Sequence, residues 1–436
     1  MQDNVRILAK GQLRSNDTWA TGLNNNDLIV GPSGAGKTRS YVKPNIMQCN
    51  ESMIIADTKG SLISEVGPVL ERSGYKVIHM NFKDLGEACG YNPLDYIRYD
   101  KSRRAYSEQD VMTVANALIP TARQEDPYWE NAARMYATCM IAYALEFLPR
   151  REHSLQYVME LFAQMGNGNL RKLFQEAEAA RPNSLVAQTY RLFAANCVSE
   201  KTEASILAVL GEKFNGLQFD AALRMYHRKK RINFMALGRE KTAVFLTISD
   251  MDRSMDRLIS LFYTQALQTL CDSADTDYPD HRLPVPVRFI LDDFATNAYI
   301  PDFQNIISVI RSREIYVSII LQSITQLAAL YGQENAKTII NNCDTCLYLG
   351  GGDTDTARFM SVKANKTVDT ILNMPLDAAY LFTRGSKPRM VEKFDIREHR
   401  RYAQLPEAQA RCPAPSTGVT APDPEPEKKG GRTCEL

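Results

Sequence analysis

The 436-residue sequence lacks an apolar run long enough to cross a membrane as a helix. Its longest apolar run, from Tyr136 to Leu145, is about half of the ~20 residues that a spanning helix needs. The first residues, Met1 to Asn4, have neither the basic region nor the apolar region of a secretory signal peptide. These absences predict a soluble chain.

An excess of charge of one sign is also missing, because 52 Lys and Arg residues balance 51 Asp and Glu residues. We therefore expect any contact with nucleic acid to come from a local basic surface. One candidate is the basic run from His227 to Arg231, although runs of charge are more often solvated faces. The nine cysteines are scattered over a chain too large to need a disulfide framework, which is typical of a reduced, cytosolic protein.

Two kinds of pattern alternate along the chain. Short continuous apolar runs, typical of strands covered on both faces, occur at residues 27–30, 52–56, 75–80, 243–248, 287–291, 315–321 and 346–349. A helix is expected over 37–48, after the first of these strands. Between the early and late strands, the apolar period becomes 3.6, and helices are predicted at 107–119, 128–148, 154–165, 170–179 and 184–196.

This order predicts an α/β fold with a mostly parallel sheet, interrupted by an inserted all-α domain. The predicted α/β domain is discontinuous and comprises residues 1–100 and 201–405, and the predicted all-α domain comprises 101–200. Residues 406–436 contain five prolines between Pro413 and Pro426 and few apolar residues. Their composition predicts a disordered, proline-rich tail.

The segment that carries the clearest chemistry lies between the first predicted strand and the following helix. It reads Gly31-Pro32-Ser33-Gly34-Ala35-Gly36-Lys37-Thr38 and matches the phosphate-loop pattern GxxxxGK[ST] in full. Glycines allow successive backbone N–H groups to point at phosphate oxygens, and the helix N-terminus adds a positive dipole. The pattern predicts that residues 31–38 bind ATP, with Lys37 at the β- and γ-phosphates and Thr38 as a ligand of Mg²⁺.

A second element follows the predicted strand at 287–291, which ends in Asp292 and Asp293. In this interpretation Asp292 holds Mg²⁺ and Asp293 polarises the attacking water. Two further catalytic candidates are less specific. Gln322 ends the strand at 315–321, where related ATPases place a sensor of the γ-phosphate, and Arg311 could reach a neighbouring subunit's nucleotide as an arginine finger. Each could instead be a solvated surface residue.

Taken together, the motifs resemble a known family. They occur in this order: Asn24-Asn25-Asn26, the phosphate loop, Lys43-Pro44-Asn45, Asp57-Thr58-Lys59-Gly60, Tyr91-Asn92-Pro93-Leu94, Leu291-Asp292-Asp293-Phe294-Ala295, Arg311-Ser312-Arg313, Leu321-Gln322-Ser323, Asn342-Cys343-Asp344 and Tyr348-Leu349-Gly350. This set, over about residues 20–402, resembles the TraG-like type IV secretion coupling proteins, which are conjugative DNA-transfer ATPases related to FtsK and RecA-type motors.

The resemblance implies a RecA-like nucleotide-binding domain that carries the all-α domain and assembles as a homo-hexamer. It further implies DNA binding without sequence preference, recruitment of a relaxase–DNA complex, and delivery to a secretion channel at the cytoplasmic, inner face of the cell membrane. By position, Lys37 and Thr38 match the Walker A pair, Asp292 and Asp293 match Walker B, Gln322 matches the glutamine motif and Arg311 matches the arginine finger.

The sequence departs from the family pattern in two ways. Asp293 stands where the family usually has Glu, which bears on the rate of hydrolysis. The phosphate loop begins at residue 31, so the usual N-terminal membrane helices are missing. The chain is therefore expected to be either truncated or a soluble variant that docks on a separate membrane-anchor subunit.

Three functions remain for this pattern. The first is a DNA-translocating motor that hydrolyses ATP with Mg²⁺. The second is a nucleotide-switched substrate receptor with little motor activity, which the shorter side chain of Asp293 favours. The third, a small-molecule kinase or protein-export ATPase, leaves the helical insertion and the spacing of Arg311 and Gln322 without an evident role.

Overall fold

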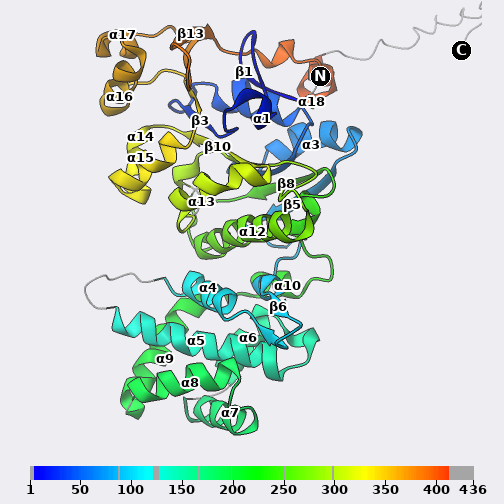
Figure 1. The fold of residues 1–436 in the computed structure, drawn as a ribbon, viewed down its shortest axis with the longest axis vertical. Coiled ribbons are helices and arrows are strands. Elements are labelled where there is room, and N and C mark those ends of the chain that lie inside the picture. The colour runs from blue at the N-terminus through cyan, green and yellow to red at the C-terminus, as the bar shows by residue number, and fades with distance from the viewer. Residues whose placement is uncertain are drawn as a thin grey trace, which may run out of the picture.

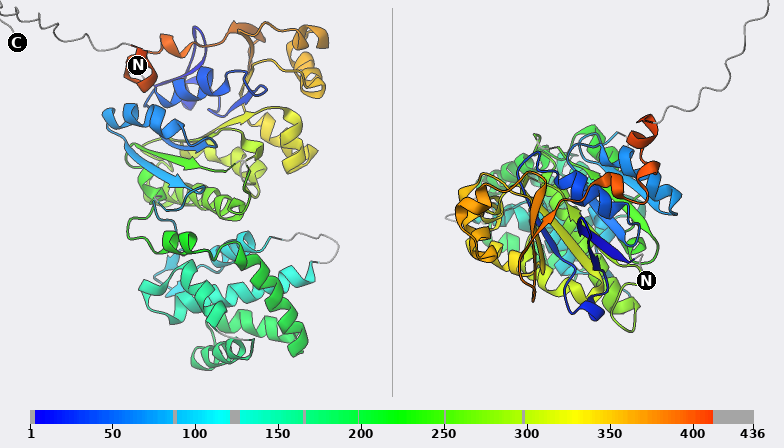
Figure 2. Two further views of the ribbon diagram at one scale, coloured as in Figure 1. Left: turned by 180° about the vertical axis from the view of Figure 1, so that it is seen from behind. Right: turned by 90° about the horizontal axis from the view of Figure 1, so that it is seen from above.

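The computed structural model describes residues 4–86, 89–120, 127–164, 167–197, 199–249, 251–296 and 299–411. Figure 1 shows an elongated molecule in which a body built on a sheet lies above a body made mainly of helices. Viewed from behind in Figure 2, the chain leaves the upper body once, forms the helices, and returns. None of the helices in the described ranges has the length and apolar character needed to span a bilayer.

The upper body is built on one sheet, in which the described strands have the order β13-β12-β11-β3-β10-β9-β4-β8-β5. The parallel strands are β3 (Asp27–Val30), β4 (Ser52–Asp57), β5 (Lys76–Asn81), β8 (Thr242–Thr247), β9 (Val287–Leu291), β10 (Ile315–Leu321) and β11 (Thr345–Tyr348). The predicted α/β fold with a mostly parallel sheet is confirmed, and a strand lies at each of the seven predicted positions.

Both faces of the sheet are buried, which explains why its strands have continuous rather than alternating apolar sequences. Successive side chains point to opposite faces. Ile54 of β4 lies in the same apolar cluster as Leu258 of α12 (Asp256–Asp277). Its neighbour Ile55 lies in the other cluster, with Val66 of α3 (Leu62–Arg72). The two apolar clusters, one on each face of the sheet, hold the strands in place, so the carboxyl ends of β3, β9 and β10 lie at a common edge.

The lower body contains α4 (Glu108–Leu118), α5 (Tyr128–Phe147), α6 (Leu155–Gln164), α7 (Asn167–Ala180), α8 (Leu185–Asn196), α9 (Glu200–Asn215) and α10 (Asp220–His227). At its centre, the Tyr136 ring of α5 packs edge-on against Phe174 of α7 and Phe193 of α8. The Tyr136 hydroxyl donates to Glu203 of α9 at 3.3 Å. Since α9 and α10 contact α5 and α6, we propose that the helical domain continues beyond residue 200 to about residue 227.

Several elements were not anticipated. An N-terminal hairpin, β1 (Val5–Ala9) and β2 (Gln12–Ser15), is joined to the phosphate-loop helix by Asn45, whose amide accepts from Ile7 N and donates to Ile7 O, each at 2.8 Å. The antiparallel strands β12 (Ala378–Thr383) and β13 (Arg389–Glu392) extend the sheet past β11. The remaining short strands, β6 (Tyr99–Asp100) and β7 (Ala105–Tyr106), form a hairpin.

The helix expected over 37–48 is not a regular α-helix. It begins as a π-helical turn, η1 (Thr38–Val42), in which Lys43 N bonds to Thr38 O, and continues as α2 (Lys43–Ile46). Pro44 has no N–H to donate to the preceding turn, so regular α-helical bonding cannot run through this point. The outcome is a wider first turn directly after the phosphate loop.

The other helices are mostly short and complete the layers around the sheet. They are α1 (Thr18–Thr21), α11 (Phe234–Leu237), α13 (Phe303–Val309), α14 (Ile324–Tyr331), α15 (Gln333–Asn341), α16 (Thr354–Ala364), α17 (Val368–Leu372) and α18 (Pro406–Arg411). Of the predicted tail, residues 406–411 thus form a helix, and residues 412–436 lie outside the described residues.

Candidate nucleotide-binding site

The phosphate-loop segment leaves the carboxyl end of β3, a central strand of the sheet, and turns directly into η1. Two of its glycines have left-handed backbone angles, with φ of +81° at Gly34 and +89° at Gly36. At Gly31 an added Cβ would lie 3.0 Å from Leu349 Cβ and 3.1 Å from Ala35 Cβ. The loop therefore needs glycine at these positions, whereas Ser33 is exposed.

Lys37 folds back onto its own loop. Its ammonium donates to the carbonyl oxygens of Gly31 at 2.7 Å and Pro32 at 3.1 Å, and it lies 3.9 Å from Asp293 Oδ1. Burial lowers the pKa of Lys37, an effect that Asp293 and Asp292 oppose. The ammonium is thus held at the loop by weak neutral acceptors, which phosphate oxygens could replace.

Asp292 directly follows β9, a strand on the far side of β10 from β3. Its carboxylate accepts a hydrogen bond from the hydroxyl of Thr38 at 3.1 Å. Burial, together with the charge of Asp293, raises the pKa of Asp292 to about 6, although the Thr38 hydroxyl and Lys37 act in the opposite direction. A buried carboxylate beside a hydroxyl offers two hard oxygen ligands of the kind that Mg²⁺ takes from proteins. These residues fit the metal ligands that the motifs predict.

Asp293 has a left-handed backbone with φ of +47°, which is uncommon for a residue other than glycine. Gln322, which follows β10, donates its side-chain amide to Asp293 Oδ1 at 3.4 Å. The same carboxylate oxygen lies 3.9 Å from the Lys37 ammonium. Strained backbone angles cluster at functional sites, where the surrounding structure holds a side chain in one direction. Asp293 is held between the other two residues.

Arg311 is not brought to this group. It lies in the turn η5 (Ile310–Arg313), which precedes β10, whereas Gln322 follows that strand. Its guanidinium donates to the carbonyl of Thr18 at 3.3 Å. Arg311 and the phosphate loop therefore lie at opposite ends of the parallel strands within one chain.

Comparison with known proteins decides the family. The family model described as type IV secretory system conjugative DNA transfer matches residues 4–371. The chain belongs to this family. Membership confirms the resemblance drawn from the motifs.

This chain is similar to the protein VirD4 of Rhizobium radiobacter, to which it is 23% identical over 336 residues, covering 77% of this chain and 47% of VirD4. The chain thus spans about half the length of this curated relative. Among solved structures, the unbound monoclinic form of the conjugative coupling protein TrwBdeltaN70 has a TM-score of 0.65 at 17% identity, covering 90% of both chains. The plasmid coupling protein TrwB in complex with ADP and Mg²⁺ has a TM-score of 0.62 at 17% identity, covering 85% of both chains. These similarities show a shared fold.

One residue at this site, Lys393, was not predicted from the sequence. Lys393 follows the edge strand β13, and its ammonium donates to Ala35 O of the phosphate loop at 3.0 Å and to Leu349 O at 3.1 Å. Burial lowers the pKa of Lys393. No local pattern marks this lysine, because its position depends on the β12–β13 hairpin, which itself was not predicted.

Proposed function

We propose that this member of the conjugative DNA-transfer family is an ATP-driven coupling protein, which binds DNA and its relaxase and delivers them to the type IV secretion channel as a hexameric motor. One observation carries the proposal: Lys37, Thr38, Asp292, Asp293 and Gln322 come from three neighbouring strands and converge at one edge of the sheet. This is the edge at which open α/β sheets bind ligands.

The residues present fit ATP and Mg²⁺. The loop from Gly31 to Thr38 has the glycine conformations that let backbone N–H groups turn toward phosphate. Thr38 and Asp292 would hold the metal, which when bound neutralises charge on the phosphates. Lys37 would exchange the carbonyls of Gly31 and Pro32 for phosphate oxygens, which are stronger, charge-assisted acceptors.

Asp293 would orient the water that attacks the γ-phosphorus and accept a proton from it at the carboxylate. Gln322 would keep that carboxylate directed into the site through the contact it already makes. Hydrolysis then breaks the bond between the γ-phosphorus and the oxygen that stays on ADP. Residues held in position before the reaction lower its barrier because little reorganisation remains.

Arg311 would act on the nucleotide of a neighbouring subunit in the ring. Its distance from its own phosphate loop supports an action between subunits rather than within one. An Arg311→Ala protein that binds ATP normally but hydrolyses it slowly should regain activity in mixed rings, when combined with a Lys37→Ala protein that supplies an intact Arg311. This role would be contradicted if no mixture had an ATPase rate above the sum of the rates of the two separate proteins.

The motor itself is tested by ATPase measurements with and without DNA. We expect turnover that rises with DNA and with protein concentration, and its loss in Lys37→Ala. Lys76→Ala is a matched control, because Lys76 is exposed on the edge strand β5 and pairs with Glu240. An ATPase that ignores DNA at every salt concentration, in a protein that binds no DNA, would overturn the motor.

A nucleotide-switched receptor is the second candidate, and Asp293 favours it. Its side chain is one methylene shorter than the Glu usual in the family, and it is engaged with Gln322 and Lys37. In a receptor, ATP would drive assembly while hydrolysis stayed slow. A turnover near zero that rises strongly in Asp293→Glu would favour the receptor over the motor.

We place the working protein at the inner, cytoplasmic face of the cell membrane, with a separate membrane-anchor subunit beside the channel. This location follows from the proposed delivery of a substrate into the channel. Fractionation of cells that carry the whole secretion system tests it. Recovery in the membrane fraction only when the anchor is present is the expected result, and recovery in the soluble fraction throughout would contradict it.

A further inference from the structure

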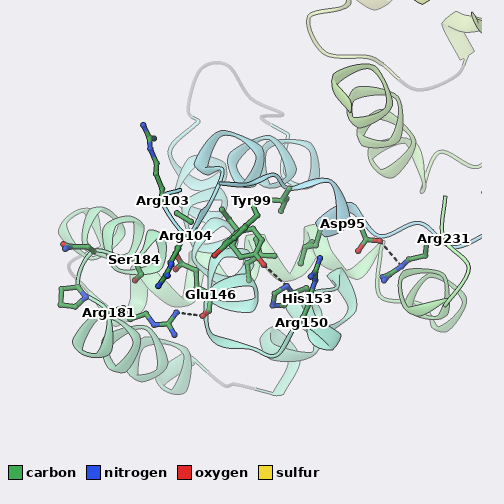
Figure 3. A pocket seen from close by; sticks show the side chains of 17 residues that line it. Asp95, Tyr99, Arg103, Arg104, Glu146, Arg150, His153, Arg181, Ser184 and Arg231 are labelled. Atoms are coloured by element: carbon green, nitrogen blue, oxygen red, sulfur yellow. Dashed lines mark hydrogen bonds and ion pairs between the residues drawn. The ribbon is translucent and has the colours of Figure 1, made fainter. Parts of the chain in front are cut away.

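A cavity of about 1010 Å³ opens in the helical body (Figure 3). Its lining is rich in arginine, which comes from four separate segments of the chain: Arg103, Arg104, Arg150, Arg181 and Arg231. Aromatic side chains, Tyr99, Tyr106 and His153, line it as well. Figure 3 shows Tyr99 near the middle, between the arginines of the β6–β7 turn and Arg150.

The acidic residues of the cavity are already engaged. The Glu146 carboxylate accepts the backbone N–H groups of Leu185 at 3.1 Å and Val186 at 3.2 Å, at the start of α8. Asp95 pairs with Arg231 at 3.0 Å. Both carboxylates therefore already have partners within the protein.

Arginines that lack a close ion pair lie on the hairpin turn and before α6. Within the described part of the chain, the side chains of Arg104 and Arg150 form no ion pair, and Arg103 approaches only Asp100, at 3.7 Å. The Arg103 side chain is 84% exposed. The turn that carries Arg103 and Arg104 is held in place by Asp100. The carboxylate of Asp100 accepts hydrogen bonds from Ser102 N at 2.8 Å and from Arg103 N at 3.2 Å. The cavity therefore has surplus positive charge on a prearranged backbone.

The aromatic residues form a supported row. The Tyr99 and Tyr106 rings meet edge to face with centroids 5.0 Å apart, and Tyr106 meets His153 in the same way at 5.9 Å. The Tyr106 hydroxyl and His153 Nδ1 lie 3.3 Å apart. Tyr99, at the open end of the row, is 49% exposed. An exposed ring braced by a second ring is a surface on which a flat, unpaired base can stack.

We propose that this cavity binds a short single-stranded segment of nucleic acid, with phosphates on Arg104 and Arg150 and a base on Tyr99. Guanidinium groups that follow a backbone, combined with an aromatic platform, are the recurring way in which proteins bind single strands. A duplex keeps its bases paired and stacked inside, so it offers no base to a ring within a cavity. An acidic peptide would satisfy the arginines but would leave the exposed ring of Tyr99 without a partner.

The inference rests on the proposed DNA-handling function and adds to it a site and a strand preference. The experiment measures fluorescence anisotropy of labelled oligo-dT with the full chain over a range of salt concentrations. We expect Arg104→Ser/Arg150→Ser to weaken binding and to reduce the slope of log K against log[salt] by about 1.4, since each phosphate contact on a single strand contributes about 0.7. Arg151→Ser is the matched control, because Arg151 is a neighbouring, 83% exposed arginine outside the cavity lining.

Variants of Tyr99 distinguish the contribution of base stacking to binding from the contribution of charge. Tyr99→Leu should weaken oligo-dT binding roughly 5- to 150-fold at any salt concentration, the range expected for loss of one base–aromatic stack. Tyr99→Phe should bind as the unchanged protein does, and a duplex of the same length should be insensitive to both changes. Thermal melting and the ATPase rate without DNA should stay the same in all variants, which excludes misfolding.

The outcomes keep the two proposals apart. Absence of DNA binding by the unchanged protein would overturn the DNA-handling function itself. Binding that is equally tight in the arginine and Tyr99 variants would overturn the cavity site and leave the function standing. If a duplex displaced oligo-dT and bound with the same affinity as oligo-dT, the proposed preference for single strands would be overturned. Binding of a polyglutamate peptide that is lost in the arginine variant, with oligo-dT binding unaffected, would reassign the cavity to an acidic protein partner.

Discussion

The Thr38 hydroxyl donates a hydrogen bond of 3.1 Å to the carboxylate of Asp292, a residue 254 positions away in the sequence. The two residues meet because their strands, β3 and β9, both pair in parallel with β10 and end at the same edge of the sheet. The bond joins the two candidate ligands of Mg²⁺ to each other. It also places a carboxylate with a raised pKa where a divalent cation would stabilise its charge.

Replacing Asp292 separates metal binding from nucleotide binding. In Asp292→Asn we expect Mg²⁺ to add little to the affinity for ATP, whereas affinity without Mg²⁺ should persist because Lys37 and the loop are intact. The melting temperature without ligand should rise at pH 7.5, since a buried ionised carboxylate is removed. Calorimetry with and without Mg²⁺ measures the first effect. Asp355→Asn is the control, because Asp355 lies in an exposed pair with Arg358. An unchanged Mg²⁺ dependence of ATP binding in Asp292→Asn would contradict the role of Asp292 as a metal ligand.

The position of Asp293 between Lys37 and Gln322 predicts a specific loss of turnover. Asp293→Asn should lower kcat about 10²- to 10⁴-fold, the usual contribution of a positioned acid–base group. Nucleotide affinity should change little, because the side chain is expected to contact water rather than phosphate. Steady-state ATPase and equilibrium binding give the two values. A variant that loses ATP binding as well as turnover would show instead that Asp293 shapes the loop.

Lys393 predicts a link between the edge hairpin and the phosphate loop. Its ammonium donates a hydrogen bond to the Ala35 carbonyl and so helps to hold the loop backbone in one orientation. Lys393→Met should raise KM for ATP several-fold with a smaller effect on kcat, and Lys393→Arg should restore most of the affinity. Lys387→Met, in the exposed turn between β12 and β13, is the control. Equal effects of Met and Arg on KM would show that packing, not charge, matters there.

His399 predicts how stability depends on pH. It is 5% exposed, and burial, together with Arg401 and Arg400, lowers its pKa to about 4 from an ordinary value of 6.5. Between these values the unfolded chain binds a proton that the folded chain does not, so this residue makes the fold less stable as pH falls from 6.5 to 4, by up to about 3 kcal/mol. Denaturant unfolding should show a shallower pH dependence in His399→Asn than in the unchanged protein. Substitution of the exposed His281 by Asn should leave the profile unchanged, and an unaltered slope in His399→Asn would contradict the prediction.

Local patterns were sufficient for much of this fold. The seven parallel strands were predicted because strands buried on both faces have continuous apolar sequences, as at Ile54 and Ile55. The phosphate loop was predicted because its function depends on residue types at fixed spacing. The π-helical turn after it was missed, although Pro44 marks the place where regular helical bonding has to stop.

The antiparallel hairpin of β12 and β13 was missed because its outer strand is largely exposed and has no continuous apolar run. Helices α9 and α10 were not predicted, because their attachment to the helical body depends on distant contacts, such as the one between Tyr136 and Glu203. For α9 the stabilising partner on α5 is remote in sequence, so no local window contains the signal.

By itself, the sequence determined which residues have the chemistry for phosphate and magnesium, since those requirements are met within short segments such as residues 31–38. Only the tertiary structure decided which of them meet. Parallel strand pairing brings Thr38, Asp292, Asp293 and Gln322 to one edge and leaves Arg311 at the opposite edge. The antiparallel hairpin of β12 and β13 brings Lys393 to the loop. The physical reason is that strand order and register are fixed by burial of the whole sheet, which no single segment specifies.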